Sequence, residues 1–351
     1  MSEKPPQFER PPIPVYGNLP EEVKERISDE FQQKFREGEL TELSDELLEQ
    51  IKNLEYDKRT FELDFIETAN RVINNLREKY GLPAFDVPGK NIHIIPPELF
   101  RKLSAQPFTA FHDYRRQLIF ADADKLRYSD NKLSSASLLF HEMSHLKGFL
   151  SLDARMTKGK DGKEETERSY RRIGLMISEG YRNNDRDEWY ESFRGLNEAV
   201  VSELEQRYEN EIAAGSADVS VTEELEWLKS DEALRLKQEA ARNKRFPSEE
   251  IQWISRDGKK WIARSYRHQR RVLKYLVEQI ATDTAQPVEQ VYELFFKAHF
   301  TGNIREIAKL IEDVFDQGSF RVLGMMTGDA SSANQMLNYL KKQRLKMDKD
   351  E

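Results

Sequence analysis

The sequence predicts an α+β protein in which a small mixed sheet and one long apolar helix are flanked by helical regions. Three observations lead to this prediction. Short runs rich in β-branched and aromatic residues at 91–95, 108–112 and 117–121 are typical of strands. The segment 133–149 has the apolar spacing of a helix with a buried face. Apolar residues also recur at helical spacing on both sides of this region.

Composition and periodicity divide the chain into four regions. Residues 1–20 contain six prolines and little periodicity, which predicts a flexible tail. Residues 21–85 are expected to form an N-terminal helical region, and residues 86–210 to form the core that contains the strands. Residues 211–345 are expected to form a mainly helical C-terminal region. Within the core, the polar segment 180–190 is interpreted as a loop.

The composition excludes several classes of protein. The chain has no cysteine, which rules out disulfides, a thiol nucleophile and a cysteine-bound metal. The net charge is −8 and no basic block stands out, so nucleic acid is not an expected partner. No apolar run at the N-terminus resembles a signal peptide, and no stretch reaches the roughly 20 apolar residues of a membrane span. We therefore expect no membrane partner and a cytoplasmic location.

A His-Glu-x-x-His run at 141–145 is the strongest functional signal. On a helix, positions four apart lie on one face, so His141 and His145 can direct imidazole nitrogens at one metal ion. Glu142 lies about 100° further round the helix and can reach a water on that metal as a general base. Leu139, Met143, Leu146 and Leu150 form an apolar stripe on the opposite side. This pattern predicts a zinc-dependent hydrolase.

Catalytic zinc normally takes three protein ligands and a water, so a third ligand is needed. A longer version of the motif would supply a histidine at position 151, but that residue is Ser151, and Asp153 lies two positions too far along. A carboxylate from a later helix is the remaining option. Glu198 is the best candidate, because an acid in an otherwise apolar turn is unfavourable unless it is paired or bound to metal.

For four other polar residues the sequence suggests either a hydrogen bond to the site or a purely structural role. Glu203 and Glu205 follow Glu198 by one to two turns, and either could accept a hydrogen bond from a ligand histidine or simply face solvent. His93 and His112 lie in or beside the predicted strands and are interpreted as structural residues.

The run His-Glu-Met-Ser-His at 141–145, followed by Gly-Leu-Asn-Glu-Ala at 195–199, resembles the zincin superfamily of metallopeptidases in its gluzincin branch. In that branch the third ligand is a Glu on a later helix. The resemblance covers about residues 90–210. One departure is Ser202, because many gluzincins place an acid four residues after the ligand Glu.

The resemblance implies a zincin-like core with Zn²⁺ held by His141, His145 and Glu198, and with Glu142 as the base. It also implies a small sheet whose edge binds an extended peptide. The expected activity is hydrolysis of peptide bonds in a peptide or protein substrate by a metal-activated water.

A donor to the transition state is usual in such sites. Tyr190, eight residues before the expected third ligand, is one candidate, and Tyr170 and Tyr266 are alternatives. Three other functions stay open, of which the narrowest is a self-processing or partner-specific protease, because no generous peptide groove can be recognised in the sequence. The chain could be a regulatory or partner-specific protein on a zincin scaffold that cleaves little, or a helical interaction module in which the motif is accidental.

Overall fold

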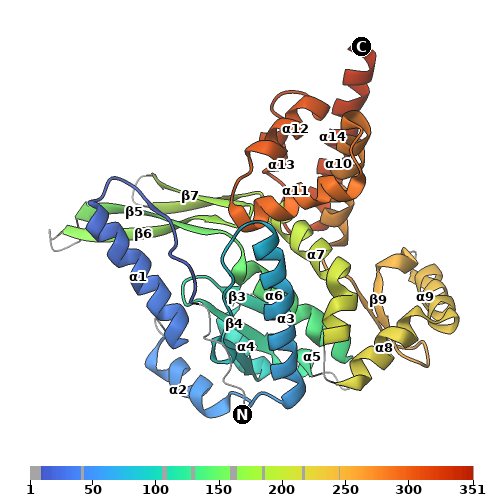
Figure 1. Ribbon diagram of the computed structural model, residues 1–351, viewed down its shortest axis with the longest axis horizontal. Coiled ribbons are helices and arrows are strands. Elements are labelled where there is room, and N and C mark those ends of the chain that lie inside the picture. The colour runs from blue at the N-terminus through green and yellow to red at the C-terminus, as the bar shows by residue number, and fades with distance from the viewer. Residues whose placement is uncertain are drawn as a thin grey trace. The chain divides into compact units, whose positions relative to one another are not determined.

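The computed structural model, shown as a ribbon in Figure 1, describes residues 9–40, 43–104, 109–127, 131–158, 164–183, 186–215, 218–244 and 246–350. The chain forms two compact units. Unit 1 comprises Met1–Pro11, Gln32–Lys147 and Glu205–Ser265, and unit 2 comprises Pro12–Phe31, Gly148–Leu204 and Tyr266–Glu351. Helices combined with small sheets confirm the predicted α+β fold. Among the described residues, no helix has the length and apolar character needed to cross a membrane.

A three-stranded mixed sheet forms part of unit 1. Across the sheet the strands are β2 (Ile92–Ile95), β4 (Leu118–Asp122) and β3 (Ala110–Asp113). β2 runs parallel to β4, and β3 runs antiparallel to it. These are the three strands that the β-branched and aromatic runs predict. Side chains of one face join a buried cluster with α2 (Asp45–Leu54) and α4 (Pro97–Leu103).

Two long helices of unit 1, α3 (Thr60–Lys79) and α6 (Lys132–Lys147), lie side by side (Figure 1). Phe65, Val72 and Leu76 of α3 are at most 2% exposed, as their helical spacing predicts. Helix α6 also contacts β3 and β4. The helix that carries the His-Glu-x-x-His motif is therefore held by both a helix and the sheet.

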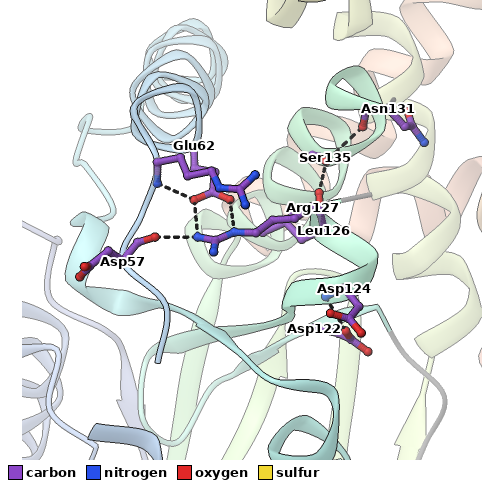
Figure 2. Close-up of polar contacts among 9 residues, drawn as sticks. Asp57, Glu62, Asp122, Asp124, Leu126, Arg127, Asn131 and Ser135 are labelled. Atoms are coloured by element: carbon purple, nitrogen blue, oxygen red, sulfur yellow. Dashed lines mark hydrogen bonds and ion pairs between the residues drawn. The ribbon is translucent and has the colours of Figure 1, made fainter. Parts of the chain in front are cut away.

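Polar contacts anchor the chain where it enters α6, as Figure 2 shows. Glu62 of α3 is fully buried, and its Oε1 accepts a hydrogen bond from Arg127 Nε at 2.8 Å. Arg127 also donates to the backbone oxygen of Asp57 at 2.6 Å. Ser135 Oγ, in the first turn of α6, donates to the backbone oxygen of Leu126. These contacts fix the start of α6 relative to α3.

The other elements of unit 1 are short. They are η1 (Gly89–Asn91), α5 (Ala123–Leu126), α8 (Val219–Lys229), α9 (Asp231–Lys244), η2 (Ser248–Glu250), and a two-stranded antiparallel sheet of β9 (Ile251–Ile254) and β10 (Trp261–Ala263). Two further helices, α1 (Glu21–Glu37) and α7 (Arg194–Gly215), contain residues of both units.

Unit 2 contains a five-stranded sheet. Its strands, in order, are β1 (Val15–Tyr16), β5 (Leu150–Lys158), β6 (Glu164–Ile173), β7 (Met176–Asn183) and β8 (Arg186–Ser192). β1 is parallel to β5, and the remaining pairs are antiparallel. The C-terminal part of unit 2 is helical, as expected. Its helices are α10 (Arg267–Thr284), α11 (Val288–Thr301), α12 (Arg305–Phe315), α13 (Ser319–Leu323) and α14 (Ala330–Asp350).

The expectation of a flexible tail at 1–20 is corrected for the part that the structure describes; residues 1–8 lie outside it. Ile13 is 6% exposed, and Val15–Tyr16 pairs with β5. Arg10 is 5% exposed and donates a hydrogen bond to the backbone oxygen of Leu146 at 3.1 Å. Residues that lie between the prolines therefore pack, which the proline content alone does not reveal.

The expected loop at 180–190 is also corrected where the structure describes it; residues 184–185 lie outside the described part. Strands β7 and β8 pair in register from Ile177 opposite Ser192 to Asn183 opposite Arg186. Strand pairing satisfies backbone groups and does not require an apolar side-chain pattern, so a polar sequence can form these strands. The expected linear boundaries at 21–85, 86–210 and 211–345 differ from the two units, because each unit combines segments that are distant in sequence.

Candidate metal centre

Helix α6 holds the His-Glu-x-x-His motif in a buried position. Asn131 Oδ1 accepts the backbone N–H of Ser134 at 3.0 Å, which caps the first turn. Of the predicted apolar stripe, Leu139, Met143 and Leu146 are at most 1% exposed, whereas Leu150 lies beyond the end of α6, at the start of β5. The three motif residues are themselves only 3–7% exposed. A buried polar set of this kind requires partners within the protein or a bound ion.

The two motif histidines direct the same ring nitrogen at each other. Nε2 of His141 lies 3.2 Å from Nε2 of His145, and the two rings are inclined at 70°. Two nitrogens that bind one tetrahedral zinc ion at its usual bond length lie about 3.3 Å apart. The pair therefore has the separation that two ligands of a single zinc ion need.

A carboxylate fixes the protonation of the first of these histidines. Nδ1 of His141 lies 3.3 Å from Oε2 of Glu205, on α7, and an ionised carboxylate can only accept a hydrogen bond. Nδ1 is therefore the nitrogen that donates to this carboxylate, and Nε2 is the nitrogen that faces His145. Gln252 of β9 donates to the other oxygen of Glu205 at 3.0 Å. From the sequence, either Glu203 or Glu205 is a candidate to accept a hydrogen bond from a ligand histidine. In the structure Glu205 accepts it.

The structure groups Glu198 with the two histidines. One ligand atom from each of His141, His145 and Glu198 lies within 4.8 Å of the other two. The two histidines are buried, and Glu198 is half-buried. Glu198 lies on the first half of α7, seven residues before Glu205, and residues seven apart on a helix share a face. The set of two imidazoles and one carboxylate is the donor set of many catalytic zinc sites.

Glu142 faces a histidine that the motif does not contain. Its Oε2 lies 3.0 Å from Nδ1 of His112, and both side chains are about nine-tenths buried. Burial alone would raise the pKa of the Glu142 carboxyl. The hydrogen bond with His112 and the charges of His141, His112 and His145 outweigh that effect and lower the pKa. A lowered pKa favours the ionised form of this carboxyl.

His112 is the site residue that sequence reasoning missed, since it was interpreted as structural. Its ring stacks on His145 with centroids 4.6 Å apart, and it contacts the ring of Tyr114 at 3.8 Å. One signal was present in the sequence. In the strand Ala110–Asp113, His112 alternates with Phe111, which packs in the apolar cluster, so His112 lies on the other face.

His93 is placed as expected of a structural residue. Its Nδ1 lies 2.9 Å from Oε2 of Glu55, and its ring stacks on Phe120. Glu203, the alternative to Glu205, pairs with Arg270 at 3.5 Å.

The remaining residues considered from sequence lie on defined elements. Tyr190 is on β8 and 55% exposed, and Tyr266 precedes α10 with a left-handed backbone conformation. Tyr170 is on β6. Ser151, at the position that the longer motif would give to histidine, is fully buried in β5. The proposed role of Tyr190 stays a prediction.

Comparisons with known proteins find no relative. No protein-family model matches the sequence, and searches of curated proteins and of solved structures give no match. The likeness to gluzincins therefore rests on the two sequence runs, and the functional argument rests on the geometry of the side chains.

Proposed function

We propose that this protein is a zinc-dependent metallopeptidase. The observation that carries the proposal is the grouping of His141, His145 and Glu198 within 4.8 Å, with the two imidazole Nε2 atoms 3.2 Å apart. Hydrogen-bonded carboxylates behind ligand histidines are typical of zinc sites, and Glu205 occupies such a position behind His141. A zincin-like core around α6 and the sheet β2–β4–β3 is part of this proposal.

In the proposed reaction, each residue of the site has a separate role in peptide hydrolysis. His141, His145 and Glu198 would hold the ion. A bound zinc ion would supply a Lewis acid that lowers the pKa of a coordinated water and polarises a carbonyl group. Glu142 would accept the proton of the attacking water and then donate it to the leaving amine. Tyr190 is the proposed donor to the developing oxyanion.

Replacement of the base tests this function directly. Glu142→Gln keeps the size of the side chain and its ability to accept from His112 but removes the basic carboxylate. We expect the zinc-loaded variant to retain stoichiometric zinc and to lose about 10²–10⁴-fold in cleavage of denatured casein and of a mixed peptide library. Glu55→Gln is the matched control, because Glu55 also pairs with a histidine in unit 1 and should keep full activity.

Three outcomes decide between the open functions. Equal cleavage by the wild type and Glu142→Gln would refute the role of Glu142. Stoichiometric zinc without cleavage of any substrate would favour a regulatory or partner-specific protein on the same scaffold. Absence of zinc from both the wild type and His141→Ala would leave the motif without a metal and favour an interaction module.

A further inference from the structure

The imidazole of His112 lies beside the proposed base and has a fixed orientation. One face stacks on His145 at a 25° interplanar angle, and the ring of Tyr114 contacts it edge-on at 72°. The side chain is 10% exposed. Its Nδ1 points at Glu142 Oε2 at 3.0 Å. A buried ring packed against two other rings has little freedom to rotate away from this partner.

We infer that His112 is a positioning residue that holds one carboxylate oxygen of Glu142, so that the other oxygen is left to take the proton of the attacking water. The inference rests on the proposed function, in which Glu142 is the base. It adds a residue from β3, outside both sequence motifs, to the site.

The proton in the His112–Glu142 hydrogen bond can be assigned from its partners. As the proposed base, Glu142 acts as a carboxylate that can only accept a hydrogen bond, so Nδ1 of His112 is the donor in this contact. The hydrogen bond occupies Oε2 and resists rotation of the carboxylate about its last bond. A base acts efficiently only when its accepting atom is within hydrogen-bond reach of the proton that it removes. Without the hydrogen bond from His112, Glu142 could still accept a proton. Its carboxylate would, however, spend less time in the orientation that reaches the attacking water.

The turn after β3 is built to hold this imidazole. Asp113 Oδ1 accepts the backbone N–H groups of Arg115 and Arg116 at 2.9 and 3.2 Å, which closes a tight turn. Gln117 follows with a φ of 59°, and its side chain donates to the backbone oxygen of Tyr114 at 2.6 Å. The turn therefore places the ring of Tyr114 in contact with His112. The strand contributes its own constraint, because His112 pairs in register with Ile119 on β4.

Three substitutions test the role of the Nδ1 donor. Asparagine places its amide nitrogen as many bonds from Cβ as histidine Nδ1, glutamine places it at the distance of Nε2, and alanine has no donor. We expect His112→Asn to keep kcat within about fivefold of wild type, whereas His112→Ala and His112→Gln lose about 10–100-fold. KM on a fixed fluorogenic peptide from the cleaved library should stay unchanged, and all three variants should retain stoichiometric zinc.

His93→Ala is the matched control, because it removes another His–Glu pair, in which the histidine lies on β2 of the same three-stranded sheet as His112. It should leave kcat unchanged. Two results would overturn the inference while leaving the proposed function intact: wild-type kcat in His112→Ala, or equal kcat in His112→Asn and His112→Gln. Loss of zinc from His112→Ala would also overturn it, because the residue would then support the ligands rather than the base.

A measurement that needs no substrate separates this inference from the proposed function. In zinc-loaded protein labelled with ¹⁵N-histidine, the imidazole signals that disappear in His112→Asn belong to His112. We expect them to show a protonated Nδ1. A His112 ring protonated only at Nε2 would overturn the inference, whether or not the wild type cleaves peptides.

Discussion

The hydrogen bond between His141 and Glu205 determines which nitrogen of the imidazole is available to a metal ion. Glu205 accepts from Nδ1 and is itself held by Gln252, so the other ring nitrogen, Nε2, is the atom that faces His145. A carboxylate behind a ligand histidine also makes the ligand nitrogen more basic. Glu205 should therefore contribute to metal affinity without touching the metal.

Glu205→Gln tests that contribution. The neutral amide accepts a weaker hydrogen bond, so we expect zinc affinity to fall about 10–100-fold, measured by competition with a fluorescent chelator. Glu209→Gln, one turn further along α7, is the control, because Glu209 pairs with Arg264 at 2.9 Å and should not affect affinity. An unchanged dissociation constant in Glu205→Gln would contradict the assigned role.

Individual residues of the site differ in how well the sequence predicts them. His141 and His145 are four positions apart on one helix, so their convergence follows from helical geometry alone. Glu205 could be proposed only as one of two carboxylates, since its choice over Glu203 depends on where α7 faces. His112 is 30 residues from Glu142, and no local pattern specifies which helix a strand residue will meet.

Helix α6 is secured at its N-terminal end by residues far away in the sequence. Oε2 of Glu224, on α8, accepts the backbone N–H of Leu133 at 2.9 Å. Burial raises the pKa of Glu224 to about 7, and the opposing hydrogen bonds from Leu133, Trp253 and Lys132 do not cancel that effect. Glu224 also lines a cavity of about 610 Å³ with Trp227 and the β9–β10 hairpin.

Glu224 should make stability depend on pH. Its folded pKa of about 7 is above the ordinary value of 4.5, so the folded protein binds the proton more tightly than the unfolded chain does. Its contribution is therefore fully present below about pH 4.5 and is lost as pH rises through about 7. Glu224→Gln keeps an acceptor for Leu133 but cannot ionise.

We expect Glu224→Gln to be more stable than wild type at pH 8, by about 1–3 kcal/mol, and to be equal to it near pH 4.5. Urea unfolding at both pH values measures this difference. Glu223→Gln is the control, because Glu223 is exposed and should change neither value. Lower stability of Glu224→Gln than of wild type at pH 8 would contradict this. It would show that the ionised carboxylate stabilises the start of α6 by more than the burial of its charge costs.

The C-terminal end of α6 is secured by buried cations. Arg10 donates to the backbone oxygen of Leu146, and Arg77 donates to that of Lys147 at 2.5 Å. Both guanidinium groups lie over the ring of Phe85, 5.4 and 4.7 Å from its centroid. Positive charge at a helix C-terminus is favourable, and these donors satisfy carbonyls that have no partner within the helix.

Arg10→Ala should destabilise the fold by about 1–3 kcal/mol, because it leaves buried acceptors on Leu146 and Gln117 without this donor. Chemical denaturation measures the loss. Arg36→Ala is the control: Arg36 is 65% exposed and forms a surface pair with Glu9, so its loss should change stability by less than about 0.5 kcal/mol. Equal stability of the two variants would contradict a role for residue 10 in holding α6.

The elements that the sequence predicts well are those with a strong local pattern. The strands β2, β3 and β4 follow short runs rich in β-branched and aromatic residues, and the helix α6 follows an apolar stripe at helical spacing. Strands β7 and β8 do not, because their pairing depends on neighbouring strands rather than on their own composition. The N-terminal segment was interpreted as a tail because proline-rich segments lack a period, yet Arg10 is buried by distant partners.

For the complete chain, metal binding and folding stability should be linked. An ion that binds only the folded protein stabilises it by about 2.7 kcal/mol at a concentration 100 times its dissociation constant. We expect zinc to raise the melting temperature of the chelator-treated protein by about 5 °C. His141→Ala should show no such shift. Identical melting curves for the wild type with zinc and with chelator would contradict a metal centre within the fold.

The α+β character of the chain could be predicted because it depends on many local patterns at once. The division into units could not, because each unit is assembled from three separate segments. Periodicity describes neighbours along the chain, whereas the units are defined by packing between residues such as Arg10 and Leu146, which are 136 positions apart.

The contact between His141 and Glu205 has a consequence for synthesis on the ribosome. The two residues are 64 positions apart, and Gln252, which holds Glu205, comes later still. A nascent chain that has exposed only α6 therefore displays two histidines whose supporting carboxylate has not yet been translated. Tight capture of zinc should accordingly be a late event, delayed until most of the polypeptide has left the exit tunnel.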